Sequence, residues 1–221
     1  MIDRQTAQND GETRSRCPRA SAIVLALSCV LVAAHMPARG DDTANPSAAA
    51  LIEALLDGRE PVGGPFDLID QTGRRRTDAD FRGKLGLLYF GYTHCPDVCP
   101  TELQALSLAL DMLGSAGDAV QPLFITVDPE RDTPSHLADY VTAFHPRLIA
   151  LTGPDAAIRK VALAYKVYFV KSSAAQRGDY AVDHTGFIYL IGKDGRYLEF
   201  LPPGSSPEQI AEAVRAKLEE P

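Results

Sequence analysis

The sequence predicts an α/β domain in which a central mixed sheet is flanked by helices, and three observations support this class. Apolar runs of strand length alternate with amphipathic helical segments through most of the chain. The chain closes with two strand-like segments around the turn 193–195 and a last helix. Two cysteines, Cys95 and Cys99, lie between one apolar strand and the helix that follows it. Together these features are typical of a thioredoxin-like fold.

The first elements are a hairpin, a buried strand and a helix. Segments 66–69 and 74–77 flank residues 70–73, whose composition is typical of a turn. Segment 85–90 is almost continuously apolar, as expected of a central strand that is covered on both faces. Segment 101–113 carries leucines three and four residues apart, which predicts a helix with one buried face.

The remaining elements continue the alternation of strands and helices. They are strand 123–127, a helix opened by Thr133-Pro134, strand 148–151, a helix that buries Ile158, Val161, Ala162 and Tyr165, a short strand 167–170, hairpin strands 187–191 and 197–201, and a helix that begins at the capping box 206–209.

The N-terminal segment 1–40 is predicted to be a secretory signal or a single membrane anchor. Residues 20–34 carry no charge, Arg14, Arg16 and Arg19 precede them, and small residues suited to cleavage follow at 38–40. Fifteen apolar residues are fewer than the roughly 20 that span a bilayer. Extension of the segment through residue 36 would make an uncleaved membrane anchor possible. Cys17, Cys29 and His35 lie in this segment. Export predicts a periplasmic protein, either free or anchored to the inner membrane.

Residues 41–61 are expected to form a linker with one short helix, and 62–221 the thioredoxin-like domain. Residues 41–221 contain 17 basic and 26 acidic residues, a formal charge of −9. Such an acidic surface does not suit nucleic acid.

The cysteine motif spans residues 91–100. If its second half is helical, Cys95 and Cys99 lie on one side with Cα atoms roughly 6 Å apart, within reach of a disulfide or of one metal ion. Pro100 suits the first helical position, so Cys99 is expected to be the N-cap residue, with its thiolate stabilised by the helix terminus. The alternative is an inert disulfide or two buried thiols.

His184 is the candidate third ligand. It precedes the strand 187–191, and two thiolates with one imidazole suit Cu(I), which prefers soft ligands. A structural histidine is the alternative on these residues alone. Asp183 is a candidate to orient the His184 ring. Asp128 ends a strand, and it either lies near the metal site or serves as a turn residue. The other histidines are weaker candidates, with His94 expected to point away from Cys95, and His136 and His145 expected at the surface.

The chain resembles the SCO/SenC family of copper-binding assembly proteins over residues 62–219. The resemblance is carried by Gly64-Pro65-Phe66, Phe81-Arg82-Gly83-Lys84, the run from Tyr89 to Pro100, Val127-Asp128-Pro129-Glu130-Arg131-Asp132-Thr133-Pro134 and Asp183-His184-Thr185. It implies a thioredoxin-like fold, copper bound by Cys95, Cys99 and His184, and a role in building the dinuclear copper centre of cytochrome c oxidase.

Three functions remain to be compared. The first is a copper metallochaperone that delivers copper to cytochrome c oxidase subunit II, supplied by a periplasmic copper donor or thiol reductant. The second is a thiol–disulfide reductase that acts on oxidase or chaperone cysteines, which the same two sulfurs could perform. Three residues between the cysteines, and His184 where thioredoxins place a proline, favour the metal. The third is a peroxiredoxin, which is disfavoured because the Thr or Ser expected three positions before a peroxidatic cysteine is Tyr92 or Pro96.

Overall fold

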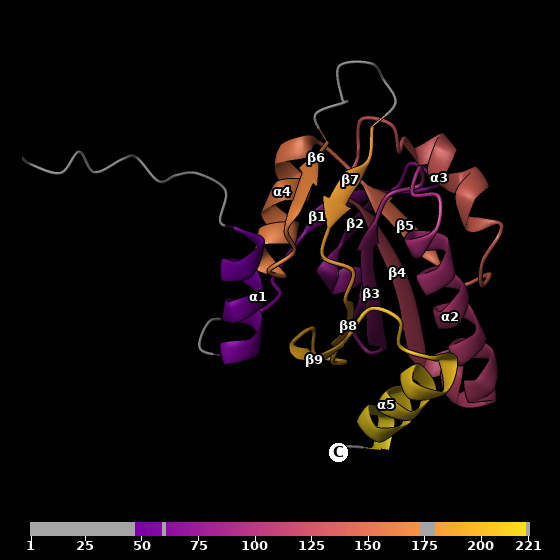
Figure 1. The fold of residues 1–221 in the computed structure, drawn as a ribbon. Helices are drawn as coiled ribbons and strands as arrows, with labels where there is room; N and C mark the ends of the chain where they lie inside the picture. Colours follow the sequence, from indigo (N-terminus) through magenta and orange to yellow (C-terminus); the bar gives the residue numbers. More distant parts are fainter. Residues whose placement is uncertain (1–46, 59–60, 173–179, 220–221) are drawn as a thin grey trace, which may run out of the picture. The chain divides into compact units, whose positions relative to one another are not determined.

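The computed structural model describes residues 47–58, 61–172 and 180–219, and its main feature is a mixed sheet of seven strands (Figure 1). In chain order these strands are β1 (Asp67–Asp70), β2 (Arg75–Thr77), β3 (Leu85–Gly91), β4 (Val120–Thr126), β5 (Ile149–Thr152), β8 (Ile188–Ile191) and β9 (Tyr197–Leu201). Their spatial order is β2-β1-β5-β4-β3-β8-β9. The predicted mixed sheet is therefore confirmed.

Strand β3 lies inside the sheet and is buried at every position. It runs parallel to β4 and antiparallel to β8, and β4 in turn runs parallel to β5. A parallel pair needs a crossover connection, and helices supply it. Because β3 is covered on both faces, its sequence is an apolar run without alternation, as predicted.

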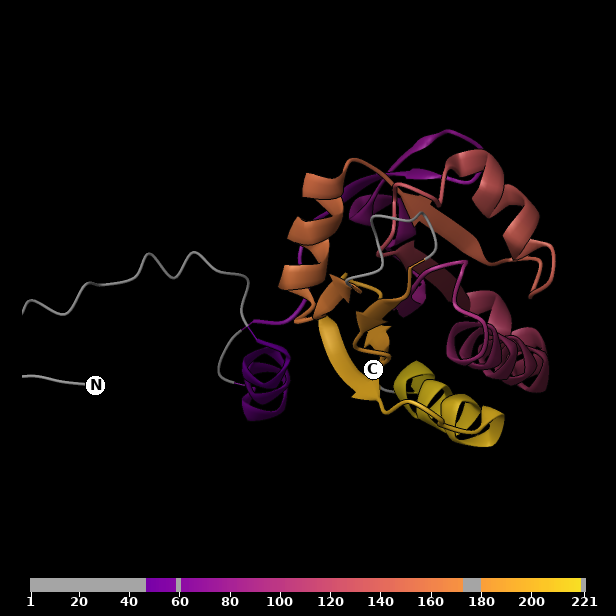
Figure 2. The ribbon, with the colours of Figure 1, turned by 45° about the horizontal axis from the view of Figure 1, so that its top comes forward.

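Helices cover both faces of the sheet (Figure 2). They are α1 (Ala48–Asp57), α2 (Val98–Leu113), α3 (Pro134–Val141), α4 (Asp155–Ala164) and α5 (Pro207–Glu219), together with two short 3-10 helices, η1 (Asp78–Phe81) and η2 (Gly114–Ala119). Figures 1 and 2 show α2, α3 and α5 on one face and α4 on the other. Helix α2 buries its leucines in the same core cluster as the side chains of β3 and β4.

The start of α2 differs from the prediction. The helix begins at Val98, three residues before position 101, and its N-cap is Asp97 instead of Cys99. Pro100 occupies the third helical position. It is tolerated there because the N–H groups of the first turn have no partner within the helix, so a residue without an N–H loses nothing.

A separate two-stranded ribbon carries His184. It pairs β6 (Phe169–Lys171) with β7 (Val182–His184) in antiparallel register, with Phe169 opposite His184. The sequence predicted a strand near β6 but none at β7, because three residues are too few to show a period. His184 thus ends its own strand, and a short connection separates it from β8.

The C-terminal elements agree with the prediction. Strands β8 and β9 form the antiparallel hairpin. Ser206 and Gln209 form the capping box of α5, with the Ser206 N–H donating to Gln209 Oε1 at 2.8 Å and the Gln209 N–H donating to Ser206 Oγ at 3.3 Å.

The predicted signal or anchor, residues 1–40, lies outside the described residues. Among the helices that the structure describes, none is both long and apolar enough to cross a membrane.

Candidate metal centre

The fold brings Cys95, Cys99 and His184 together. Cys95 lies on the turn from β3 into α2, Cys99 lies in the first turn of α2, and His184 comes from the end of β7. Cys99 Sγ lies 3.6 Å from His184 Nε2. Cys95 Sγ accepts a hydrogen bond from the Cys99 N–H at 3.4 Å. Three groups that are up to 89 positions apart in sequence therefore converge at one end of the central strand.

The two thiols differ in their electrostatics. Partial burial opposes ionisation of Cys95, but the N–H groups of Cys99, Asp97 and Val98 outweigh it and hold its pKa below the usual range. Burial raises the pKa of Cys99 to about 12. The sequence predicted that the helix terminus would stabilise the Cys99 thiolate, which is wrong. Since Cys99 is already the second helical residue, the sulfur at the end of the helix is that of Cys95.

The ring of His184 is held in one orientation. Its Nδ1 lies 3.1 Å from the carbonyl oxygen of Val182, so Nδ1 carries the hydrogen in this bond. The lone pair of Nε2 is then directed at the Cys99 sulfur. Burial lowers the pKa of His184 and keeps the imidazole neutral, which is the form that binds a metal.

Aromatic side chains enclose the Cys99 sulfur. The Tyr89 hydroxyl lies 3.6 Å from Sγ and donates to it, and the Tyr92 ring meets the His184 ring edge to face at 5.7 Å. The sequence alone did not indicate that these tyrosines belong to the site. For Tyr89, the alternation of side chains along a strand could have indicated its place. Tyr89 lies on the same face of β3 as Gly91, and a Cβ atom at position 91 would lie 3.0 Å from the Cys99 sulfur.

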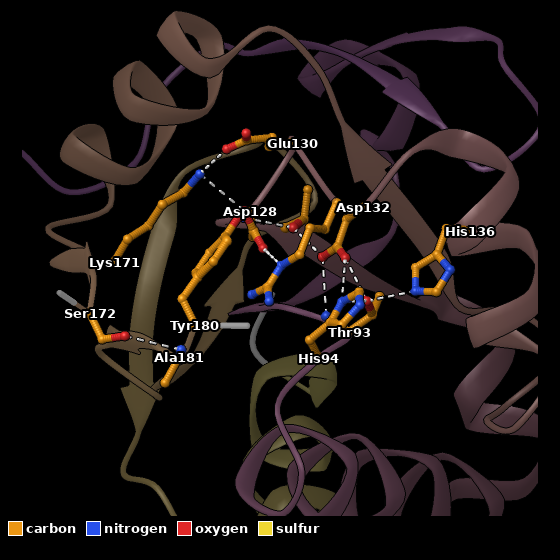
Figure 3. A network of polar contacts seen from close by, with 12 residues as sticks. Thr93, His94, Asp128, Glu130, Asp132, His136, Lys171, Ser172, Tyr180 and Ala181 are labelled. Atoms are coloured by element: carbon orange, nitrogen blue, oxygen red, sulfur yellow. Dashed lines mark hydrogen bonds and ion pairs between the residues drawn. The ribbon is translucent and has the colours of Figure 1, made fainter. Parts of the chain in front are cut away.

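Of the two predicted supporting aspartates, one is exposed and the other is bound to residues outside the cysteine pair. Asp183 is exposed, and the acceptor that fixes the His184 ring is the Val182 carbonyl. Asp128 is fully buried and binds Arg131, Tyr180 (2.8 Å) and Lys171 (3.4 Å) (Figure 3). Its connection to the centre is indirect, because the Arg131 guanidinium lies 5.8 Å from the Tyr92 ring centroid.

The remaining described histidines lie away from the sulfurs. His94 turns from Cys95, as predicted, and its ring stacks on His136 with 5.3 Å between centroids. His136 is exposed, also as predicted. His145 is not a surface residue, because only 10% of its side chain is exposed and its N–H donates to Ser107 Oγ. The loop after α3 turns it inward.

Two of the three groups are already spaced for one bound ion, whereas Cys95 must move to join them, because the ligand atoms of Cys95, Cys99 and His184 do not all lie within 4.8 Å of one another. For metal–sulfur and metal–nitrogen bonds of about 2.3 and 2.0–2.1 Å, as in zinc sites, a sulfur and a nitrogen on one ion are about 3.6–3.8 Å apart. The Cys99 Sγ to His184 Nε2 distance of 3.6 Å falls in this range without movement. Two sulfurs and one imidazole form a soft donor set, which favours Cu(I) among the common metals.

Comparison with known proteins assigns the family. The SCO1/SenC family model matches residues 56–219. Protein sco1 of Schizosaccharomyces pombe is 43% identical over 160 residues, which cover 71% of this chain and 61% of that protein. The mitochondrial SCO2 homolog of Bos taurus is 48% identical over 154 residues, which cover 69% and 58%. The chain therefore matches less than two thirds of the length of these relatives.

A solved structure supports the same assignment. Copper-bound ScoI of Bradyrhizobium japonicum is 45% identical, with a TM-score of 0.66, and the match covers 71% of this chain and 99% of that one. The thioredoxin-like fold is thereby confirmed. The chain belongs to the SCO1/SenC family.

Proposed function

We propose that this protein is a copper metallochaperone that serves assembly of the dinuclear copper centre of cytochrome c oxidase. The observation that supports it most is the convergence of Cys95, Cys99 and His184, with 3.6 Å between the Cys99 sulfur and His184 Nε2. Copper is the cargo in this proposal. The copper-bound ScoI relative shows that this fold at 45% identity holds the metal.

Each residue has a distinct part in the proposed transfer. The more exposed Cys95, whose pKa is lowered, meets the incoming ion first and ionises more readily than Cys99. The buried Cys99 gives up its proton on binding, and neutral His184 completes the site without losing one. An acceptor thiolate then replaces one ligand at a time, starting at Cys95, so that copper is never free in solution.

A thiol–disulfide reductase is the second candidate. A dithiol reductase needs one accessible thiol of low pKa and a second thiol that resolves the mixed disulfide. Cys95 and Cys99 show this difference in exposure and pKa. The same centre therefore suits both chemistries, and His184 distinguishes them because only the metal site needs it.

The setting of the proposed function follows from the N-terminal sequence. We propose residues 1–40 as an export signal or inner-membrane anchor, 41–61 as a linker and 62–221 as the copper-binding domain in the periplasm. The proposed acceptor is oxidase subunit II, and the supplier is a periplasmic copper donor or thiol reductant. Asp183 and Asp128 are proposed to support the centre through charge and through the Arg131–Tyr92 contact.

A deletion strain separates the two candidates. Loss of a chaperone should lower oxidase activity at low copper, and added copper should restore part of it by mass action. Added copper should not replace a missing reductant, because oxidised acceptor cysteines bind no metal. The His184→Ala variant keeps both thiols and loses one ligand, so it should fail to restore oxidase at low copper. Full restoration by this variant would favour the reductase.

A redox assay tests the proposed control of binding. The Cys99 N–H to Cys95 Sγ contact of 3.4 Å brings the Cys95 sulfur beside the first turn of α2, and we expect the two sulfurs to reach disulfide geometry from there. The oxidised protein should carry a Cys95–Cys99 disulfide, bind no copper and recover binding after reduction. Full copper loading of the oxidised protein would contradict this control.

A further inference from the structure

A second cluster of metal-binding side chains lies beside the cysteine turn. It is formed by His94 in that turn, Asp132 in the loop before α3, and His136 in the first turn of α3 (Figure 3). One ligand atom of each residue lies within 4.8 Å of the other two. The cluster contains no sulfur, so its chemistry differs from that of the candidate copper centre.

Asp132 supplies a fixed carboxylate. Its side chain is fully buried. Its Oδ2 accepts hydrogen bonds from the Thr93 N–H (3.1 Å) and the Thr126 hydroxyl (2.5 Å). Its Oδ1 faces the two histidines. In the part of the chain that the structure describes, His94 at 3.9 Å is the one basic side chain within ion-pair distance of this carboxylate. A buried carboxylate without a Lys or Arg partner favours binding of a cation.

The Thr93 hydroxyl lies at the centre of the cluster. Thr93 Oγ1 is 2.5 Å from Asp132 Oδ1, 2.9 Å from His136 Nε2 and 3.1 Å from His94 Nδ1. A hydroxyl has one hydrogen to donate, and the 2.5 Å bond to the carboxylate takes it. Both imidazole nitrogens and the carboxylate oxygen therefore converge on the Thr93 hydroxyl, and an ion can bind all three once it displaces this hydroxyl and the two nitrogens give up the hydrogens that they donate to it.

We propose that His94, Asp132 and His136 form a thiol-independent site for a divalent first-row metal ion, with Zn²⁺ and Cu²⁺ as the ions that its chemistry suits. Imidazole nitrogen and carboxylate oxygen are ligands of borderline and hard character, which Zn²⁺ and Cu²⁺ bind well and Cu(I) binds weakly. Ligands bound at about 2.0–2.2 Å in a tetrahedral site lie about 3.3 Å apart, so the cluster must contract by up to ~1.5 Å. His94 and His136 are exposed and can make this movement by leaving their contacts with Thr93, while Asp132 stays fixed.

Zinc titration of a thiol-free chain tests the proposal. The full chain with Cys17→Ala, Cys29→Ala, Cys95→Ala and Cys99→Ala is titrated with Zn²⁺ by calorimetry, and its thermal midpoint is measured with and without Zn²⁺. We expect one equivalent to bind and to raise the midpoint. Loss of a residue that merely orients a ligand costs about 10–100-fold in metal affinity, so His136→Gln or His94→Gln should lower the affinity at least tenfold.

His145→Gln is the matched control. His145 also lies near a carboxylate, 3.8 Å from Asp111, but belongs to no cluster of three ligands among the described residues. Its substitution should leave zinc binding unchanged. The proposal is overturned if the thiol-free chain binds no Zn²⁺, or if His136→Gln and His94→Gln, both folded by circular dichroism, bind it as tightly as their parent. This test does not use the cysteines, so its result is independent of the proposed chaperone function.

Discussion

Substitution of Gly91 by Ala tests the packing around the Cys99 sulfur. Gly91 is the last residue of β3. A Cβ atom there would lie 2.9 Å from Phe124 Cε2, 3.0 Å from Cys99 Sγ and 3.0 Å from Tyr89 Cε1. Carbon atoms in good contact are about 3.5–4.0 Å apart, so each neighbour must move by roughly 0.5–1 Å.

The three neighbours have little room to move. Cys99, Phe124 and Tyr89 are each fully buried. Overpacking of this kind costs about 1–3 kcal/mol, and three short contacts at once place Gly91→Ala in the upper part of that range. Ala restricts the unfolded chain more than Gly does, which offsets about 0.4–1 kcal/mol of this loss. We expect a net loss of about 1–2 kcal/mol in the free energy of unfolding, and a thermal midpoint lower by about 2–8 °C.

Urea unfolding followed by circular dichroism measures this loss. The matched control is Gly64→Ala, where the new Cβ would lie 3.8 Å from the Ala164 Cβ, an ordinary contact. The control should be as stable as the parent or slightly more stable. Copper affinity should fall in Gly91→Ala and remain unchanged in Gly64→Ala, because only the first displaces a ligand sulfur. Equal stability of Gly91→Ala and the parent, within about 0.5 kcal/mol, would refute the packing argument.

Three further predictions concern the thiols and His184. At pH 7 iodoacetamide should modify Cys95 before Cys99, because burial raises the pKa of Cys99 to about 12 while helix N–H groups lower that of Cys95; equal rates by peptide mapping would contradict this. Copper affinity should rise by at least about tenfold per pH unit from pH 7 to 9, because burial raises the pKa of Cys99 to about 12 and this thiol loses a proton on binding, whereas neutral His184 loses none. Chelator competition measures this slope, and a flat profile speaks against Cys99 as a thiolate ligand. His184→Ala should weaken copper binding and abolish stable Cu(II) binding, whereas His94→Ala should preserve both at the cysteine pair; an unaltered Cu(II) spectrum in the His184 variant would exclude a three-ligand site.

Much of the fold could be predicted from the sequence because its periods are strong. The continuous apolar run of β3, the leucine spacing of α2 and the capping box of α5 each determine an element through local chemistry. The two failures have physical causes. Strand β7 has only three residues, which is too short to show a period. The start of α2 was misplaced because a proline fits any position of the first turn.

The residues of the candidate site could be proposed from the sequence, but their electrostatics could not. The spacing of Cys95 and Cys99 indicated a pair, and the resemblance added His184. The N-cap of α2 lies two residues earlier than predicted, so the sulfur at the helix end is that of Cys95. As a result the lowered pKa belongs to Cys95 and the raised one to Cys99, the reverse of the prediction. The cluster of His94, Asp132 and His136 depends on how α3 packs beside the cysteine turn, which no local pattern records.

X-ray absorption of the reduced protein loaded with one equivalent of copper tests the central claim most directly. We predict two sulfur ligands and one nitrogen ligand, with the nitrogen absent in His184→Ala and one sulfur absent in Cys95→Ala or Cys99→Ala. A copper environment of nitrogen and oxygen ligands alone, or one unchanged by His184→Ala, would contradict it.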